Sequence, residues 1–317
     1  LAGISYGSVL NCSATGNVSG NQSVGGLMGY NMGTVSNSSA AANVSGTYMH
    51  TGGLVGFNDD SNGYGSISNS SATGNVNGVD NVGGLVGINK GPINDSSASG
   101  IVDGHDSVGG LVGKNDTGRT VNTSYATGNV SNTGGGVGGL VGQNFGQVFG
   151  SYAEGNVSGG YWAGGLVGVN SDGSAVSNAY AIGNVSGTNY VGGLVGANWV
   201  ASSLINNSYS IGNVSGGGNV GGLMGTNAGT VNSSFWDMQT SNQSASDGGT
   251  GKNTSEMKDF STFFDAWWDL ICETTNGIVD IWGMDYSGAG NNGYPFLWWQ
   301  GMTHNVSFTL TYAADAN

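Results

Sequence analysis

One short stretch of the sequence groups oxygen-bearing side chains of the kind that bind metal ions. In NDDSNGYGS, at residues 58–66, the residues Asp59, Asp60 and Asn62 lie close together, and carboxylate and amide oxygens are the ligands that Ca²⁺ takes. The spacing and the terminal glutamate of an EF-hand loop are missing here. These three residues are therefore calcium candidates without a known loop pattern, and we predict no metal and no other cofactor.

A second stretch, VDGHDS, places His105 between Asp103 and Asp106. Such a group could hold a metal ion, but we favour the interpretation that it is a polar turn between two coils. The other histidines, His50 and His304, belong to no HExxH motif, and no histidine stands near a cysteine.

Catalytic motifs find no support in the sequence. The glycine cluster GGGVGG at residues 134–139 has the composition of a phosphate-binding loop, but no helical pattern follows it, so a dinucleotide site is excluded by context. Carboxylate pairs for glycoside hydrolysis would have to come from scattered, unrepeated positions. We predict a non-enzymatic protein with no catalytic residue.

The sequon Asn-x-Ser/Thr, which marks N-glycosylation, recurs along the chain. Many copies belong to the repeated NVS element, where neighbouring repeats about 4.8 Å apart would leave too little room for a glycan on each. We therefore expect partial glycosylation at turns and insertions. The candidates are Asn242, Asn253, Asn305, Asn115 and Asn21.

Composition excludes several classes of partner. The 317 residues include 64 glycines and only 8% charged residues, with a net charge of −14. Five basic residues cannot neutralise a row of phosphates, which argues against nucleic acid and against anionic lipid. No run of about 18 apolar residues is present, so we expect no direct membrane insertion.

The two cysteines, Cys12 and Cys272, lie at opposite ends of the sequence and form no CxxC motif. A disulfide between them, two free thiols, and bonds between chains all stay open. Residue 1 is Leu and the sequence opens within a repeat, so we interpret the chain as a piece of a longer protein.

The dominant feature is an internal repeat. The block VGGLVG, or a close variant, occurs eight times with leucines 26 to 31 residues apart, and an asparagine follows each block by two residues. A second segment, V-x-N-S-Y-A-x-G-N-V-S-G, completes each unit, and both segments have the length and punctuation of strands. The repeated asparagines are Asn31, Asn58, Asn89, Asn115, Asn144, Asn170, Asn198 and Asn227.

Such units cannot bury their apolar faces alone, but stacked copies can. We predict an all-β fold, a parallel β-solenoid (β-helix) of eight to nine coils of about 28 residues. The repeated asparagines should form a ladder of side-chain hydrogen bonds between coils. Glycine should supply positive φ angles at corners and let the walls of a thin coil approach. Which face VGGLVG buries stays open, since its valines and its leucine differ in parity.

Two neighbouring columns of the repeat have contrasting composition. One is alanine from Ala14 to Ala181, which indicates a tight interior column. The other changes from serine to aromatic residues, namely Tyr125, Tyr152, Tyr180, Tyr209 and Phe235. By strand alternation this column faces away from the alanines. It is either an exposed aromatic ladder that could bind a partner, or a row packed under a neighbouring loop.

The block GGLVG-x-N with its N-S-Y-A-x-G-N-V-S-G tail resembles the GLUG-motif repeats of large bacterial and archaeal surface proteins, which include adhesin-like and peptidase-associated secreted proteins. The resemblance covers about residues 1–235. It implies an extracellular scaffold whose repeats carry no chemistry.

The resemblance extends to the segment that follows. We expect residues 1–235 to be the solenoid and residues 236–300 to be a Trp-rich cap with a short helix at about 255–264. A carbohydrate-binding platform is the alternative for its tryptophans. Residues 301–317 alternate like a strand, as the start of a further domain or a strand that pairs with another subunit.

Together these features predict an extracellular structural protein of the cell surface, a subunit or shaft of a fibre, sheath or adhesin. Self-association head to tail into a filament or array is the expected partnership, because a contact that does not close gives a filament. The alternative is an adhesive module that binds glycans or other surface proteins through the aromatic ladder.

Overall fold

The computed structural model describes residues 2–271, 280–285 and 291–301. The chain divides into two compact units, Leu1–Thr254 and Ser255–Asn317. Residues 236–254, which we expected to open the cap, fold with the repeats.

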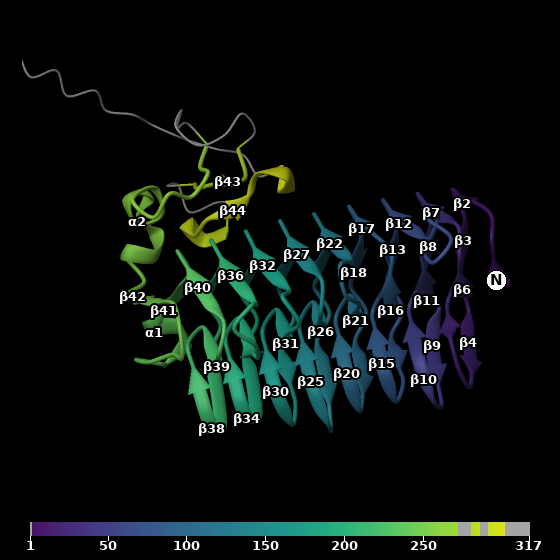
Figure 1. Ribbon diagram of the computed structural model, residues 1–317, viewed down its shortest axis with the longest axis horizontal. Coiled ribbons are helices and arrows are strands. Elements are labelled where there is room, and N and C mark those ends of the chain that lie inside the picture. The colour runs from purple at the N-terminus through teal and green to yellow at the C-terminus, as the bar shows by residue number, and fades with distance from the viewer. Residues whose placement is uncertain (1, 272–279, 286–290, 302–317) are drawn as a thin grey trace, which may run out of the picture. The chain divides into compact units, whose positions relative to one another are not determined.

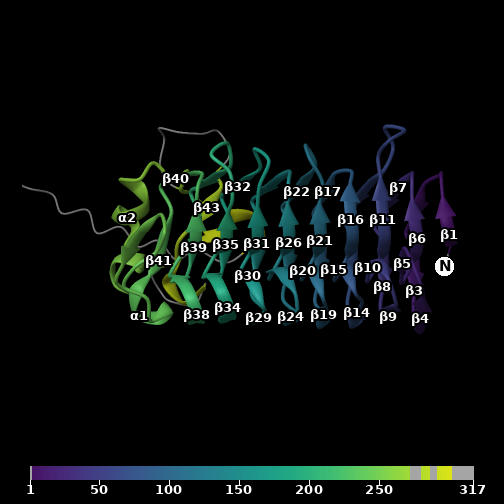
Figure 2. The same ribbon diagram turned by 60° about the horizontal axis from the view of Figure 1, so that its bottom comes forward.

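The first unit is a parallel β-solenoid of about eight turns, as predicted, in which every coil adds one strand to each of several sheets (Figures 1 and 2). Sheet 1 has nine strands, which follow each VGGL element: β1 (Ala2–Ser5), β6 (Met28–Asn31), β11 (Val55–Asp59), β16 (Val86–Lys90), β21 (Val112–Asn115), β26 (Val141–Asn144), β31 (Val167–Asn170), β35 (Val195–Asn198) and β39 (Met224–Asn227).

Sheets 2 and 3 hold the second segment of each repeat. Sheet 2 contains β2 (Val9–Leu10), β7 (Thr34–Ser36), β12 (Ser66–Ser68), β17 (Ile93–Asn94), β22 (Thr120–Asn122), β27 (Gln147–Phe149), β32 (Ala175–Ser177), β36 (Leu204–Asn206) and β40 (Thr230–Asn232). Sheet 3 contains β3 (Ser13–Ala14), β8 (Ser39–Ala40), β13 (Ser71–Ala72), β18 (Ser97–Ala98), β23 (Tyr125–Ala126), β28 (Tyr152–Ala153), β33 (Tyr180–Ala181), β37 (Tyr209–Ser210), β41 (Phe235–Asp237) and β42 (Thr250–Lys252).

Sheet 4 joins the end of one repeat to the start of the next VGG element. Its first arm contains β4 (Asn17–Gly20), β9 (Asn43–Gly46), β14 (Val76–Asn77), β19 (Val102–Gly104), β24 (Val130–Asn132) and β29 (Val157–Ser158). Its second arm contains β5 (Val24–Gly25), β10 (Met49–Gly52), β15 (Asp80–Gly83), β20 (Asp106–Gly109), β25 (Gly135–Gly138) and β30 (Tyr161–Gly164). The long strands β34 (Val185–Gly192) and β38 (Val214–Gly221) span both arms.

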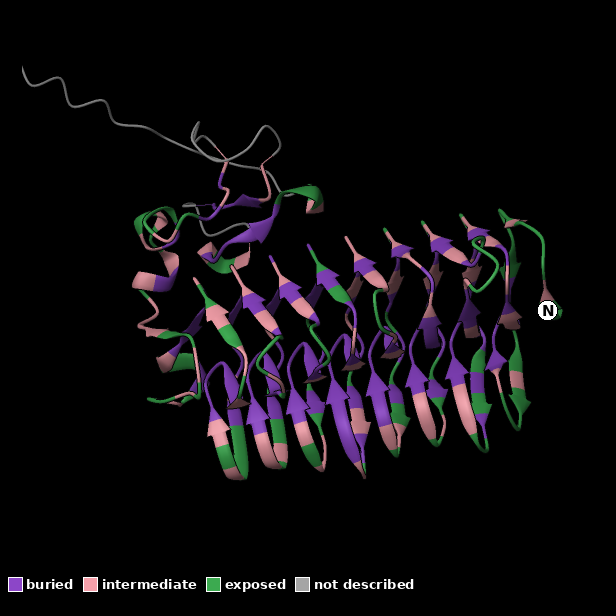
Figure 3. Ribbon diagram, in the orientation of Figure 1, coloured by how far each residue is buried: buried purple, intermediate pink, exposed green. Residues whose placement is uncertain are grey.

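The bend inside VGGLVG explains how residues of opposite parity are all buried. In the third copy, β15 ends at Gly83 and β16 begins at Val86, so Leu85 lies in the bend between two strands. Val82, Leu85 and Val86 are fully buried. Val82 joins one apolar cluster, while Leu85 and Val86 join a second, larger one that runs through the coils (Figure 3).

The paired glycines of VGGLVG are needed because neighbouring coils approach their Cα atoms closely, and not because their φ angles are positive. A Cβ on Gly84 would lie 2.0 Å from the carbonyl oxygen of Gly110 and 2.9 Å from the Cβ of Ala98, so the glycine and the buried alanine column fit each other. The expectation that glycine makes the corners is wrong for most of them. Left-handed φ angles there fall on polar residues such as Asn37, Asn69 and Asp95, whose short side chains tolerate that conformation.

The asparagine ladder forms as predicted. Each of the first seven asparagines stacks on its equivalent in the next coil, as in the pairs Asn89 and Asn115, or Asn115 and Asn144. Asn115 Nδ2 donates to Asn144 Oδ1 at 2.9 Å, and Asn144 Nδ2 donates to Asn170 Oδ1 at 2.8 Å. The first seven side chains are wholly buried, so these bonds satisfy amides that water cannot reach.

The last coil is covered by residues that follow it. Helix α1 (Met238–Ser241) comes after β41, and β42 then pairs with β41. The loop between them supplies hydrogen bonds to the coil edge, since the Ser246 hydroxyl accepts from Met224 N at 2.8 Å and Gln243 Nε2 donates to Val214 O at 2.8 Å. Trp236 packs in the apolar core beneath.

The second unit has its own aromatic core. Trp268 lies 4.6 Å from Trp282 and 4.7 Å from Phe263, measured between ring centroids, and all three are fully buried. The helix expected at 255–264 is present as two pieces. The elements are the 3₁₀ turn η1 (Glu256–Lys258), α2 (Phe260–Phe264), the antiparallel pair β43 (Trp282–Gly283) and β44 (Phe296–Leu297), and the 3₁₀ turns η2 (Asn291–Gly293) and η3 (Trp298–Gln300).

Beyond Gly301, the strand expected in residues 301–317 lies outside the described residues. Within the described part of the chain, no helix has the length and hydropathy to cross a membrane.

Candidate functional site

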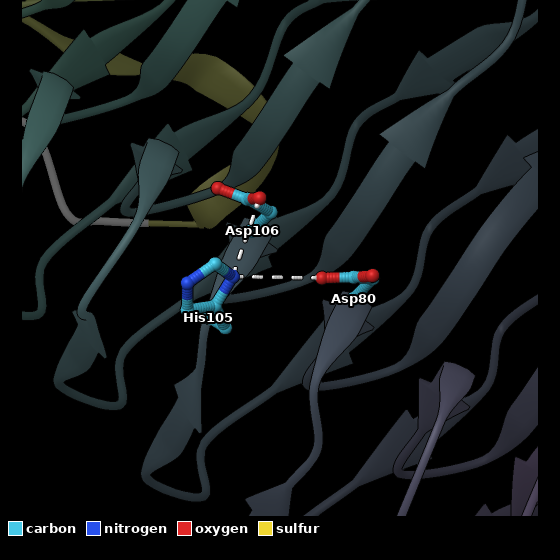
Figure 4. A group of neighbouring side chains, drawn as sticks. All are labelled: Asp80, His105 and Asp106. Atoms are coloured by element: carbon cyan, nitrogen blue, oxygen red, sulfur yellow. Dashed lines mark ion pairs between the residues drawn. The ribbon is translucent and has the colours of Figure 1, made fainter.

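The best candidate for a metal-binding group is built from Asp80, His105 and Asp106 (Figure 4). Their ligand atoms all lie within 4.8 Å of one another. His105 Nδ1 is 3.2 Å from Asp106 Oδ2 and 3.7 Å from Asp80 Oδ1. The group is at the surface, and the contacts of the His105 ring with the two carboxylates are enough to explain the arrangement.

The structure places Asp80, and not Asp103, with His105. Asp80 and Asp106 begin β15 and β20 and pair directly in the register of sheet 4. Asp103 instead accepts a hydrogen bond from the Ser131 hydroxyl at 2.8 Å. Sequence reasoning missed Asp80, although it stands two residues before the VGG element, as Asp106 does.

The calcium candidates are used to hold their own loop. Asp59 Oδ1 accepts from Ser61 N at 2.9 Å, and Asp60 Oδ1 accepts from Gly65 N at 3.0 Å. Asp60 Oδ2 also pairs with Arg119 at 3.2 Å. The Asn62 oxygen accepts from Tyr64 N. Each of the three side chains therefore already holds a hydrogen bond or an ion pair within the protein.

Around this loop lie the basic residues of the repeats. Lys90 pairs with Asp116 at 3.7 Å and stands over the ring of Phe57, 5.4 Å from its centroid. The Tyr30 hydroxyl donates to Asp59 at 2.5 Å. Burial and this bond to the Asp59 carboxylate raise the pKa of Tyr30 to about 12. Burial opposes ionisation of Asp59, yet hydrogen bonds from Tyr30 and Ser61, with the charge of Lys90, hold its pKa below the usual value.

The tyrosine column is a stacked ladder, but most of it is not an exposed face. Tyr125, Tyr152, Tyr180 and Tyr209 stack in sequence with ring centroids 5.0 to 5.1 Å apart and nearly parallel planes. Tyr152, Tyr180 and Tyr209 are buried, and Tyr125 is half-buried. The exposed interpretation is wrong for these three rings, since the faces of Tyr152 and Tyr180 are covered by neighbouring rings.

A different aromatic group is exposed, and sequence reasoning missed it. Tyr161 and Trp162 lie in β30, Tyr190 lies in β34, and Trp199 follows β35. Tyr161 and Trp199 are 51% and 47% exposed. The signal in the sequence was the aromatic residues directly before two of the blocks, YW before AGGLVG and Tyr190 before VGGLVG. The tryptophan after the ladder asparagine of the seventh copy belongs to the same signal. We call these four residues the corner aromatic cluster.

The sequons differ in whether a glycan could reach them. Asn115 is fully buried in the ladder, so its candidacy for glycosylation is wrong. Asn21 and Asn242 are exposed, and Asn253 is half-buried. Asn305 lies outside the described residues.

A second hydrogen-bonded column that sequence reasoning missed runs beside the asparagine ladder. The Ser70 hydroxyl accepts from Ser38 N at 3.2 Å and donates to Ser68 O at 2.7 Å. The serine of the repeated N-S-Y element was the available signal. In the first coil Cys12 takes this position, is exposed and forms no disulfide with a described residue. Cys272 lies outside the described residues, so a disulfide between the two cysteines stays one of the open alternatives.

Comparison with known proteins agrees with the repeat. The model of the GLUG motif matches residues 20–45 and 47–77. A protein of Evansella cellulosilytica that carries the name Gly-rich membrane protein is 41% identical over 201 residues, which cover 62% of this chain and 15% of that protein. No solved structure gives a significant match. Residues 20–45 and 47–77 thus carry the GLUG motif, and they fold into early coils of the solenoid.

Proposed function

We propose that this chain is a non-catalytic structural element of the cell surface, the shaft of a larger surface protein. The observation that carries the proposal is the buried asparagine ladder, which links coil to coil from Asn31 to Asn227. Inside the coils, glycines and buried alanines let the strands of each coil pack closely against one another. A continuous parallel solenoid of this kind holds two ends of a protein at a fixed separation.

The name of the Evansella relative supports a location at the membrane or surface. The chain spans 15% of the length of that relative, which favours a role as one module of a long protein. The scarcity of basic residues favours partners other than nucleic acid and anionic lipid.

Head-to-tail assembly into a filament is a further part of the proposal, and the structure adds a condition. At the edge of the last coil, Val214 O already accepts from Gln243 Nε2 and Met224 N already donates to the Ser246 hydroxyl. Pairing at that edge would have to displace the loop that carries them.

The surface role is tested by labelling intact cells of the source organism with antibodies against this chain, and by negative-stain electron microscopy of the native protein. We expect surface labelling and rods or fibres. Labelling only after cell lysis would contradict the surface location, and single rods at high concentration would contradict the filament. Mass spectrometry of native material that gave only the unmodified polypeptide mass would contradict glycosylation.

A further inference from the structure

The corner aromatic cluster joins strands of sheet 4 to the end of a sheet 1 strand, because Tyr161, Trp162 and Tyr190 lie in sheet 4 and Trp199 follows β35. The Trp162 and Trp199 rings meet edge to face, with centroids 5.8 Å apart and planes at 79°. Tyr190 meets Trp199 in the same way at 6.3 Å and 89°. Tyr161 lies 6.2 Å from Trp162 on the solvent side. This arrangement holds large aromatic rings rigidly at the surface while exposing about half of Trp199 and of Tyr161.

The backbone accepts strain to present two of these rings. Trp162 and Tyr190 both have φ of 57°, in the left-handed region that bulky residues seldom occupy. The same repeat position in other coils holds residues that suit this conformation. These are Ser23, His50, Asn81, Ser107, Gly136 and Asn219. Because stability alone would favour asparagine or glycine there, the aromatic residues point to a role at the surface.

Trp162 also has a feature that is unfavourable for stability. Its indole N–H is buried without a hydrogen-bond partner in the described structure. Buried polar groups are nearly always satisfied in native proteins, so a residue that combines an unpaired N–H with a strained backbone is poorly explained by folding. Asn189, which pairs with Tyr161 in the register of sheet 4, adds a half-buried side-chain amide at this place.

Few charges lie near the cluster, and they are acidic. Between residues 120 and 235, Glu154 and Asp172 are the sole charged side chains in the sequence, and the Asp106 carboxylate accepts from Gly135 N beside the Trp162 ring. A nucleic acid or a polyanion would require cationic partners that this region lacks. A neutral ligand with apolar faces and many hydroxyl groups fits best. The C–H faces of pyranose rings carry a partial positive charge, which complements the negative faces of aromatic rings.

We propose that the corner aromatic cluster binds a neutral polysaccharide, with sugar rings stacked on Trp199 and Tyr161 and hydroxyl groups bonded to Asn189. Trp162 and Tyr190 are positioning residues that hold Trp199 in place from the side.

The test is affinity electrophoresis of the full chain in gels that contain hydroxyethyl cellulose, galactomannan, dextran or soluble starch. We expect retardation by at least one of these neutral polymers and none by carboxymethyl cellulose, whose charge repels the acidic chain. Trp199→Ala should raise the dissociation constant about ten-fold or more, the loss of affinity typical of a central aromatic contact. The matched control is Phe149→Ala, which removes an aromatic ring of 42% exposure from sheet 2 and should change nothing.

Trp162→Asn separates binding from folding. Asparagine occupies this position in Asn81 and Asn219, so the variant should fold with an unchanged or raised melting temperature and still lose binding. Failure of the wild type to bind any of the four polymers would overturn the proposal, as would binding that survives Trp199→Ala. Dimers that dissociate on Trp199→Ala would show that a second copy of the chain covers the cluster, and would also overturn it.

Discussion

Residues 50–119 and residues 120–235 are built from the same repeat but have different outer surfaces. The first region, the charged coils, holds every charged residue of the repeats except Glu154 and Asp172. The second region, the aromatic coils, holds the stacked tyrosines and the corner aromatic cluster. Inside, the same asparagine ladder passes through both. The interior of each coil is therefore constrained by its neighbours, while the outer positions are free to differ along the solenoid.

The largest expected difference between the two regions is in sheet 3. Tyr180→Ser gives the aromatic coils the residue that the charged coils have at the same position, and we expect a loss of about 3 kcal/mol in unfolding free energy because a buried ring is removed. Ser71→Ala at the matched position of the charged coils should cost less than about 0.5 kcal/mol. Urea unfolding measures both. Equal costs would show that the tyrosine column adds nothing to stability.

The next effect should be the same in both regions. Asn58→Ala and Asn144→Ala each remove one member of the buried ladder and deprive each of two neighbouring amides of a hydrogen bond, at a cost of about 2–3 kcal/mol. Asn129→Ala, on an exposed column, should cost about 1 kcal/mol or less. A clear difference between Asn58→Ala and Asn144→Ala in urea unfolding would break the view that the two regions share one interior.

A smaller and opposite effect comes from extending the tyrosine column into the charged coils. Ser97 is the register partner of Tyr125, whose outer ring face lacks a tyrosine neighbour on that side. Ser97→Tyr should raise the unfolding free energy by about 1 kcal/mol through stacking. Ser97→Ala is the control for loss of the hydroxyl. Destabilisation by Ser97→Tyr in the same urea assay would mean that the column is fixed by surroundings that the charged coils lack.

The smallest effect is a pH dependence confined to the charged coils. Burial lowers the pKa of His50, and the charges of Lys90 and Lys114 lower it further. The unfolded chain then takes up the proton first, so stability is present above about pH 6.5 and falls as the pH drops from there toward the folded pKa. Melting temperatures of the wild type and His50→Asn, measured from pH 7.5 to 5, should diverge in that direction. Parallel curves would contradict a lowered pKa.

Much of the interior could be predicted from the sequence because stacking forces equivalent residues together. An asparagine that follows each VGGLVG block at a constant distance must lie against the equivalent asparagine of the next coil. The ladder from Asn31 to Asn227 therefore follows from the repeat alone. The same reasoning missed the serine column at Ser70, although its signal has the same form. Sequence reasoning also assigned positive φ angles to the paired glycines. A glycine in a sequence does not reveal whether it is needed for a positive φ angle or for the close approach of another chain segment.

The outer surface was harder to predict because coil lengths vary from 26 to 31 residues. Asp80 reaches His105 through the register between coils, and Trp199 reaches Trp162 across two strands. Neither pair is close in sequence. Asn115 shows the opposite difficulty, since one residue satisfies both a glycosylation sequon and the ladder, and burial decides between them.

The asparagine ladder also has a direction. Every side-chain amide donates toward the following coil, from Asn31 through to Asn198, so the amide dipoles add along the axis instead of cancelling. Their positive ends point toward Asn227. There the Asp247 carboxylate accepts from Asn227 N at 2.8 Å, which places a negative charge at the positive end, as acidic residues do at the start of an α-helix. The solenoid thus has an electrical polarity that its low charge content conceals, and its two ends should attract ions of opposite sign.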